Sequence, residues 1–209
     1  MMNYAIAVRK SATKLASANG TAASAIAHLL EPGCSITGIN RGQFSLIDLI
    51  RVILVHVGAA ELTVTTWTPG IAEIDEVAAL VSRCEVTAFR LLVDRSFVMR
   101  QPQYVARVRE ALGDDAIVQT RTHAKFALIG NDDWKITIRT SMNFNRNSRW
   151  EQFDIDDNPD IYAFYDALVT EIGEHTPHGL LVPNKEIERA FRRQRVPADV
   201  LRMRGDERK

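Results

Sequence analysis

The sequence lacks the features that mark several common classes of protein. Its 209 residues include only two cysteines, Cys34 and Cys84, which are too few for a disulfide scaffold and lack the spacing of a zinc site. Its 26 basic and 26 acidic residues give a formal net charge of zero, which argues against a protein that binds nucleic acid by charge alone. No apolar run approaches the roughly 18 residues of a membrane span. We therefore expect a cytoplasmic protein in a reducing environment, with no membrane partner.

Changes in composition divide the chain into three parts. Residues 1–42 are predicted to be a leader rich in alanine and serine, partly helical and separated from the core by glycines. Residues 43–175 carry the regular apolar patterns of one compact domain. Residues 176–209 are a basic tail, in which positions 185–209 hold nine basic and five acidic side chains. The tail either contacts phosphates or a partner, or is a solvated helix.

Helix and strand patterns alternate between residues 45 and 120. Apolar residues at helical spacing predict helices over 46–58, from residue 74 onward and over 102–112, and Ser45 with Asp48 is typical of a helix cap. Runs rich in β-branched and apolar residues predict strands over 62–67, 86–93 and 116–120. This order is typical of an α/β fold in which a layered mixed β-sheet is flanked by helices.

A hairpin is predicted after this alternating region. The strand-like runs 125–129 and 134–140 are separated only by Gly130, Asn131, Asp132 and Asp133, which favour a tight turn. A turn centred on Asn131 and Asp132 pairs residues whose numbers sum to about 263. A helix over 160–173, with its apolar residues on one face, is then expected to close the core.

Polar side chains occur in pairs where this hairpin begins and where it ends. His123 and Lys125 are two residues apart, as are Ser141 and Asn143, so each pair points to one face of its strand. The predicted register places Thr140 opposite His123, which brings the two pairs together at one end of the sheet. Such a pocket is cationic and rich in donors, which suits a phosphoryl oxyanion, and the imidazole can act as a nucleophile or proton carrier.

These pairs resemble the signatures of the phospholipase D superfamily. His123-x-Lys125 is similar to its H-x-K signature, and Ser141-x-Asn143 is similar to the G-S-x-N element that follows. Residues 147–151 resemble the segment that bears the acidic partner of the family's histidine, which would be Glu151. The resemblance covers residues 43–173 and is to members with one motif per chain, which are homodimeric endonucleases.

The resemblance implies a metal-independent phosphodiesterase that needs no cofactor and acts on nucleic acid, DNA more than RNA. In that family one histidine forms a phosphohistidine, a second protonates the leaving oxygen, and water releases the product. On this sequence His123 would be the nucleophile or acid, and Lys125 and Asn143 would bind the nonbridging oxygens. Ser141 would position the group, and Glu151 would orient His123. Alternatively, Glu151 pairs with a nearby arginine at the surface.

The mechanism needs two histidines, and this sequence has one such motif. A symmetric homodimer would supply the second copy of His123. Within the chain the remaining histidines are His28 and His56, predicted to be packing residues, and His175 and His178, which flank a proline in a predicted loop.

Two positions depart from the family pattern. Gly130 stands where H-x-K-x4-D predicts an aspartate, and Asp132 or Asp133 is a possible substitute. Thr140 stands where the family has glycine, which adds bulk where phosphate would approach the backbone. These departures allow an alternative function, a catalytically impaired module that binds nucleic acid or a protein partner. Trp67 and Asp94 lie at ends of predicted strands, where Asp94 either lines the pocket or forms a structural ion pair.

Overall fold

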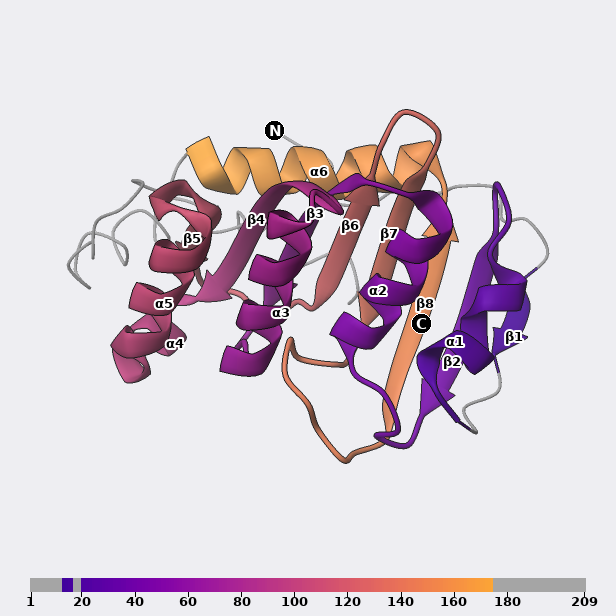
Figure 1. Cartoon of the computed structure of the whole chain (residues 1–209), viewed down its shortest axis with the longest axis horizontal. Helices are drawn as coiled ribbons and strands as arrows, with labels where there is room; N and C mark the ends of the chain where they lie inside the picture. The colour runs from indigo at the N-terminus through magenta and orange to yellow at the C-terminus, as the bar shows by residue number, and fades with distance from the viewer. Residues whose placement is uncertain (1–12, 17–19, 175–209) are drawn as a thin grey trace, which may run out of the picture. The chain divides into compact units, whose positions relative to one another are not determined.

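The computed structural model describes residues 13–16 and 20–174, and within them eight strands form a single mixed sheet (Figure 1). The order across the sheet is β1-β2-β8-β7-β6-β3-β4-β5. The strands are β1 (Lys14–Ala16), β2 (Ser35–Asn40), β3 (Ala60–Thr66), β4 (Val86–Asp94), β5 (Ile117–Thr120), β6 (Phe126–Gly130), β7 (Lys135–Thr140) and β8 (Glu151–Asp157). The predicted α/β fold class with a mixed sheet is therefore confirmed.

The sheet has two halves with different connections. Strands β3, β4 and β5 are parallel and are joined by crossover helices, as the alternating sequence pattern predicts. Strands β6, β7, β8 and β2 are antiparallel neighbours, and β6 joins the two halves by pairing antiparallel to β3. Since β6 is buried along its whole length, its continuous apolar run reads as a central strand covered on both faces.

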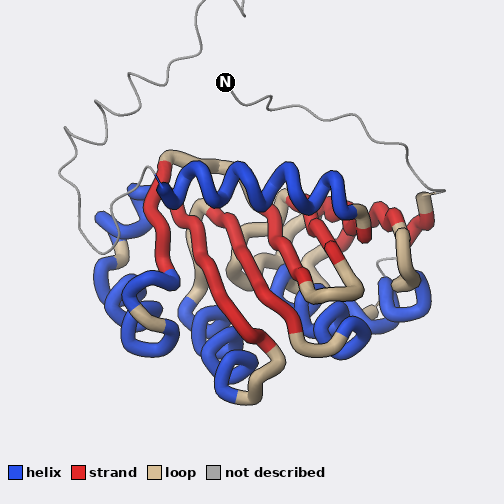
Figure 2. The backbone as a smooth tube through the Cα atoms, turned by 90° about the horizontal axis from the view of Figure 1, so that it is seen from above, coloured by secondary structure: helices blue, strands red, loops and turns tan. Residues whose placement is uncertain are grey.

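Helices cover both faces of the sheet, with α6 along one face and the other helices along the opposite one (Figure 2). Ala127 and Ile129 of β6 face the larger core, whereas Phe126 and Leu128 face α6 and pack near Val169. The helices are α1 (Ala22–Ile26), α2 (Leu46–Val57), α3 (Ile71–Ser82), α4 (Arg95–Arg100), α5 (Pro102–Leu112) and α6 (Pro159–Glu174). None of the helices in these described residues is long and apolar enough to cross a membrane.

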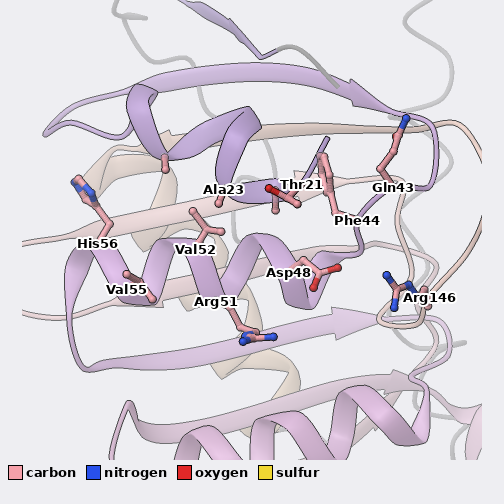
Figure 3. A pocket seen from close by; sticks show the side chains of 12 residues that line it. Thr21, Ala23, Gln43, Phe44, Asp48, Arg51, Val52, Val55, His56 and Arg146 are labelled. Carbon is pink, nitrogen blue, oxygen red and sulfur yellow. The ribbon is translucent and has the colours of Figure 1, made fainter. Parts of the chain in front are cut away.

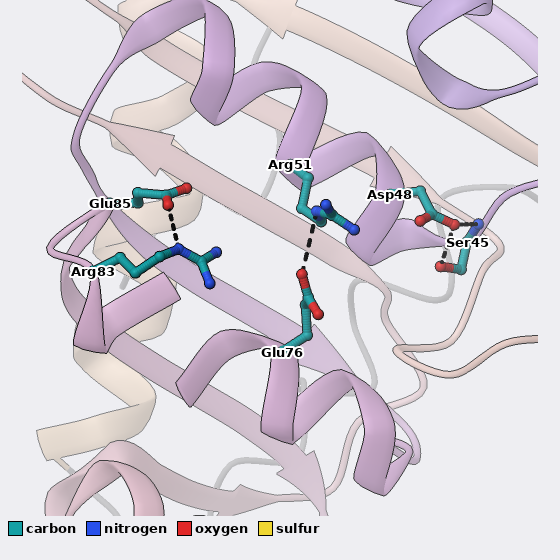
Figure 4. A network of polar contacts seen from close by, with 6 residues as sticks. All are labelled: Ser45, Asp48, Arg51, Glu76, Arg83 and Glu85. Atoms are coloured by element: carbon teal, nitrogen blue, oxygen red, sulfur yellow. Dashed lines mark hydrogen bonds and ion pairs between the residues drawn. The ribbon is translucent and has the colours of Figure 1, made fainter. Parts of the chain in front are cut away.

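The start of α2 is fixed by the predicted cap. The Asp48 carboxylate accepts hydrogen bonds from the Ser45 backbone N–H at 2.8 Å and from the Ser45 hydroxyl at 2.9 Å (Figure 4). One turn later, Arg51 pairs with Glu76 of α3 at 3.2 Å. Because both side chains are partly exposed, this ion pair adds little stability and mainly shows that the two helices are neighbours.

The β6–β7 hairpin forms as predicted, but its register differs by two. Phe126 pairs with Arg139, so facing residue numbers sum to 265. The turn spans four residues, because the Asn131 N–H donates to the Trp134 carbonyl at 3.1 Å, and its centre therefore lies at Asp132 and Asp133. Thr140 consequently faces Lys125, whose carbonyl accepts the Thr140 N–H at 3.1 Å, and not His123.

The predicted separation of the N-terminal leader from the core is wrong for the described residues. β2 pairs along its whole length with β8, and Ala22, Ala25 and Ile26 of the expected helical part are buried in the main core. The small alanines allow α1 to pack closely against α2. Position 42 is thus not a boundary of the hydrophobic core, whereas the predicted tail lies outside the described residues.

Candidate active site

The five predicted site residues all lie at one edge of the sheet. β3 and β7 end there, and β6 and β8 begin there, because these neighbouring strands are antiparallel. His123 and Lys125 precede β6, Ser141 and Asn143 follow β7, and Glu151 opens β8. In Figure 1 the loop between β7 and β8 lies at the bottom of the sheet, whereas the β6–β7 turn lies at the top.

His123 and Lys125 are in direct contact. Lys125 Nζ lies 3.3 Å from His123 Nδ1 and donates to the His123 carbonyl at 2.8 Å. His123 is exposed and Lys125 is half-buried. The contact at Nδ1 leaves the other ring nitrogen, Nε2, as the one available to a ligand.

Burial lowers the pKa of Lys125, and the nearby Glu151 carboxylate partly opposes this shift. An ammonium in a partly desolvated place interacts more strongly with an anion than one in bulk water. Lys125 is therefore well placed to bind a phosphoryl oxygen, and its lower pKa makes that binding sensitive to alkaline pH.

Ser141 and Glu151 form the second contact of the site. The Ser141 hydroxyl donates to the Glu151 carboxylate and accepts the Gln152 N–H at 3.0 Å. Glu151 thus pairs with Ser141. In the described part of the chain, no hydrogen bond joins Glu151 to His123, which Glu151 was predicted to orient. A carboxylate that holds the serine hydroxyl also fixes where Ser141 can meet a ligand.

Asn143 is anchored through β3. Thr66 ends that strand, and its hydroxyl donates to Asn143 Oδ1 at 3.4 Å while accepting the Phe144 N–H at 2.9 Å. Since Asn143 Oδ1 faces Thr66, its amide NH₂ group remains for a ligand. Beyond Asn143 the loop is tied to the buried Glu73 of α3, which accepts the Arg146 N–H and whose pKa is raised by burial.

Two further residues, Trp67 and Asp94, contact the His123 segment; the sequence assigned Trp67 no role and left Asp94 either at the pocket edge or in a structural ion pair. The Trp67 ring lies 5.9 Å from the His123 ring between centroids, and the Arg100 guanidinium lies 4.8 Å from the Trp67 ring. Asp94 accepts the Thr122 N–H at 3.1 Å and the Ser96 N–H at 2.9 Å. Asp94 therefore fixes the segment before His123 while capping α4. The only sequence signal was their place at strand ends.

Thr140, which replaces the family glycine, is used within the β7–β8 connection. Its hydroxyl donates to the Gln152 carbonyl at 2.6 Å and accepts the Met142 N–H at 3.0 Å. The side chain is thus held against β8 by two backbone groups. Its β-branch shapes the turn that presents Ser141.

Gly130, which replaces the family aspartate, lies at the opposite end of β6. A Cβ atom at this position would be 2.4 Å from the Tyr162 hydroxyl oxygen, so a larger residue fits only if the Tyr162 side chain moves. Asp132 and Asp133 are exposed in the turn and do not substitute at the site edge. Asn131 fixes the turn instead, since its amide donates to the Val57 and Ala59 carbonyls at 3.0 and 3.2 Å.

The two other histidines among the described residues do not join the site. His28 and His56 are exposed, which corrects their prediction as packing residues, and His56 lies edge-on to Trp134. His175 and His178 lie outside the described residues. In the described part of the chain, no cluster of three histidine, cysteine, aspartate or glutamate side chains could hold a metal ion.

A groove of about 610 Å³ lies between α1 and α2, on a different surface (Figure 3). Val52 and Val55 form part of its mostly apolar wall, Arg51 lies along it, and His56 and Arg146 lie at its ends. The described residues that line it include none of the five predicted site residues. The predicted site residues at the sheet edge therefore lie outside this groove.

Comparisons with known proteins agree with the fold. No protein-family model matches the sequence, and no curated protein matches it. Among solved structures, NucT from Helicobacter pylori matches 69% of this chain and 99% of its own, with 11% identity and a TM-score of 0.49. Nuc from Salmonella typhimurium, a phospholipase D family member, matches 69% of this chain and 96% of its own, with 11% identity and a TM-score of 0.47.

Polyphosphate kinase from Porphyromonas gingivalis matches 68% of this chain, with 16% identity and a TM-score of 0.50. The match spans 26% of that protein, so this chain corresponds to about a quarter of it. Likenesses at such low identity concern the fold and leave the activity open. The α/β fold class predicted from the sequence is confirmed, and the match to polyphosphate kinase is a likeness in fold alone.

Proposed function

We propose that this protein is a metal-independent phosphodiesterase, and specifically a nuclease, that acts through His123. The observation that carries the proposal is the convergence at one sheet edge of the His123–Lys125 contact and the Ser141–Glu151 hydrogen bond. This arrangement offers a nucleophilic ring nitrogen beside an ammonium and a hydroxyl. A phosphodiester needs such donors on its nonbridging oxygens as negative charge develops there.

The first chemical step joins the substrate to His123. As the phosphate binds, Lys125 leaves Nδ1 for one nonbridging oxygen, and the Asn143 amide donates to another. Nε2 of the neutral imidazole attacks phosphorus, and the bond between phosphorus and the leaving oxygen breaks. Ser141, held by Glu151, positions the phosphoryl group during this step.

The first step also needs a proton donor for the leaving oxygen on the opposite side of phosphorus, and the second step, hydrolysis of the phosphohistidine, needs a base in the same place. In the proposed homodimer the partner subunit's His123 protonates the leaving oxygen. It then takes a proton from a water molecule that attacks the phosphohistidine, and the bond between phosphorus and Nε2 breaks. A twofold axis brings a residue close to its own copy, so one motif per chain suffices. A dimer mass in sedimentation is expected, and a monomer that cleaves would contradict the shared site.

The test is hydrolysis of single- and double-stranded DNA, RNA and a simple phosphodiester in excess EDTA. The wild type is compared with His123→Ala and with His28→Ala, an exposed histidine outside the site that serves as the matched control. Cleavage that survives EDTA and the control but disappears in His123→Ala would support the proposal. Cleavage that survives His123→Ala would refute it.

The second candidate is a catalytically impaired module that binds nucleic acid or a protein partner. The observation that favours it is the Glu151 carboxylate, which holds Ser141 and leaves the His123 imidazole to Lys125. This candidate predicts no cleavage of any diester, together with nucleic-acid binding that survives His123→Ala. The same experiment therefore separates the two functions.

A further inference from the structure

A second tryptophan–arginine pair lies beside the site, and the mechanism does not use it. The Arg41 guanidinium carbon lies 4.5 Å from the centre of the Trp150 ring. Trp150 is nevertheless 65% exposed, which is unusual for the largest apolar side chain. Since Arg41 covers one face of the ring, the exposed area leaves another face open to a planar ligand.

This pair is connected to the catalytic edge by the chain itself. Trp150 directly precedes Glu151, whose carboxylate holds Ser141, and Arg41 directly follows Asn40, which faces Glu151 in the β2–β8 register. Adjacent Cα atoms are about 3.8 Å apart. Trp150 thus lies at the end of β8 that carries the site.

The two loops that bear the pair are fastened together. The wholly buried Asn40 accepts the Gln43 N–H at 3.1 Å and donates to the Phe44 carbonyl at 2.7 Å, which fixes the turn that contains Arg41. Gly42, with φ +85°, lies so close to the loop before Trp150 that a Cβ atom at position 42 would be 2.6 Å from Ser148 Cα. A ring held in this way loses little conformational freedom when it binds a ligand.

We propose that Trp150 and Arg41 form a stacking platform for a nucleobase next to the phosphate at the site, and that the substrate is therefore single-stranded nucleic acid. This inference rests on the proposed function for its substrate class. Only single strands and ends offer free base faces, because the bases of a duplex are already stacked and paired. With a formal net charge of zero, the chain attracts a polyanion weakly at long range, so local stacking must supply affinity.

The test measures binding of fluorescein-labelled oligothymidine in EDTA by anisotropy, using the full chain. The comparison ligands are the same strand with abasic sites in place of bases and a duplex of equal length. The variants are Trp150→Ala, Trp150→Phe and Val55→Ala, which removes exposed apolar surface on α2 and serves as the control. Trp150→Ala is expected to weaken binding to the single strand about 5- to 150-fold. Trp150→Phe keeps a stacking face and restores most of the affinity.

Two further readouts separate stacking from other causes. Trp150→Ala should leave abasic-strand and duplex binding unchanged, and it should leave the salt dependence unchanged because stacking releases no counterions. Unchanged single-strand binding, or an equal loss for all three ligands, would overturn the platform. A changed sedimentation mass in Trp150→Ala would also overturn it, since the ring would then belong to a protein interface.

Binding is measured separately from cleavage so that the two claims fail separately. If no diester is hydrolysed but the single strand still binds through Trp150, the proposed nuclease fails and the platform stands. If hydrolysis depends on His123 but is indifferent to Trp150 on every strand, the platform fails and the nuclease stands.

Discussion

The two ends of strand β6 differ in almost every physical respect. At its start, His123 is exposed and Lys125 is half-buried, and their polar groups face the site edge. At its other end, Gly130 is buried against Tyr162, and Asn131 closes the turn with backbone contacts. One end thus holds polar groups available to a ligand, and the other holds groups whose bonds are already satisfied. Positions 123–125 and position 130, which belong to one sequence motif, therefore serve separate purposes in this protein.

The length of β6 shows how the glycine at position 130, where the H-x-K-x4-D pattern has an aspartate, relates to the site. From residue 125 to residue 130 a strand rises roughly 17 Å at about 3.3 Å per residue. Gly130 is therefore too far from His123 to take part in the chemistry of a single phosphate. Its replacement of aspartate concerns the packing of α6, and it does not by itself argue against activity.

The largest effect is expected at the site end. Lys125→Ala removes the ammonium that would bind a nonbridging oxygen, and removing one such donor typically costs about 10²–10³-fold in kcat. The melting temperature should stay close to that of the wild type, because Lys125 is only half-buried and the substitution keeps its backbone hydrogen bond with Thr140. Steady-state hydrolysis of a simple diester and thermal unfolding of the same preparation check both statements. A large loss of stability in Lys125→Ala would contradict this division of roles between the two ends of β6.

The reverse result is expected at the turn end. Gly130→Ala forces a methyl group against Tyr162, and such overpacking typically costs about 1–3 kcal/mol of unfolding free energy. The rate of cleavage per folded molecule should not change. Urea unfolding followed by activity measurements below the transition tests this prediction. A variant with full stability but lost cleavage would show that the turn end also serves catalysis.

A smaller effect is expected from Asp94, which links the site to the scaffold. Asp94→Ala removes the cap of α4 and the acceptor of the Thr122 N–H, and loss of a cap typically costs about 1 kcal/mol. Because the segment before His123 is then less constrained, kcat should fall more than KM rises. Asp114, an exposed acidic residue, offers a control in Asp114→Ala. An unchanged kcat in Asp94→Ala would show that contacts other than those of Asp94 hold the segment before His123.

The smallest effect concerns the pH profile. Burial lowers the pKa of Lys125, so its positive charge is lost as pH rises through a value below that of an ordinary lysine. Cleavage should decline on that alkaline limb by about tenfold per pH unit. Lys125→Arg retains its charge and should move the decline to higher pH. If the alkaline decline is identical in the wild type and in Lys125→Arg, it comes from the titration of another group.

The fold between residues 45 and 173 was largely predictable because helices and central strands there have regular apolar spacing. β8 was missed because its sequence Glu151–Asp157 contains four acidic residues, which are uncommon in strands. Two of those acids have partners distant in the chain: Arg139 donates to the buried Asp156, and Asp157 accepts the Gly33 and Lys135 N–H groups. The strand propensity of single residues cannot predict such long-range pairings.

The candidate site was predictable as two polar pairs at one sheet edge, since that depends only on strand alternation and connectivity. The contacts within it were not predictable in the same way. The hairpin register moved by two because the four-residue turn lies one residue further along the chain, with Gly130 paired in β6 and Asn131 bonded to Trp134. In addition, Glu151 binds Ser141 in place of His123. Trp67 and Asp94 reach the His123 segment from β3 and β4, and these contacts exist only once the sheet has formed.

The most direct test of the central claim is to trap the covalent intermediate. The protein is mixed with bis(p-nitrophenyl) phosphate in excess EDTA and quenched in alkali, and its peptides are then weighed by mass spectrometry. We expect a p-nitrophenyl phosphoryl group on the peptide that contains His123, and none in His123→Ala. Hydrolysis of the diester without an adduct on His123, or no hydrolysis at all, would contradict the account.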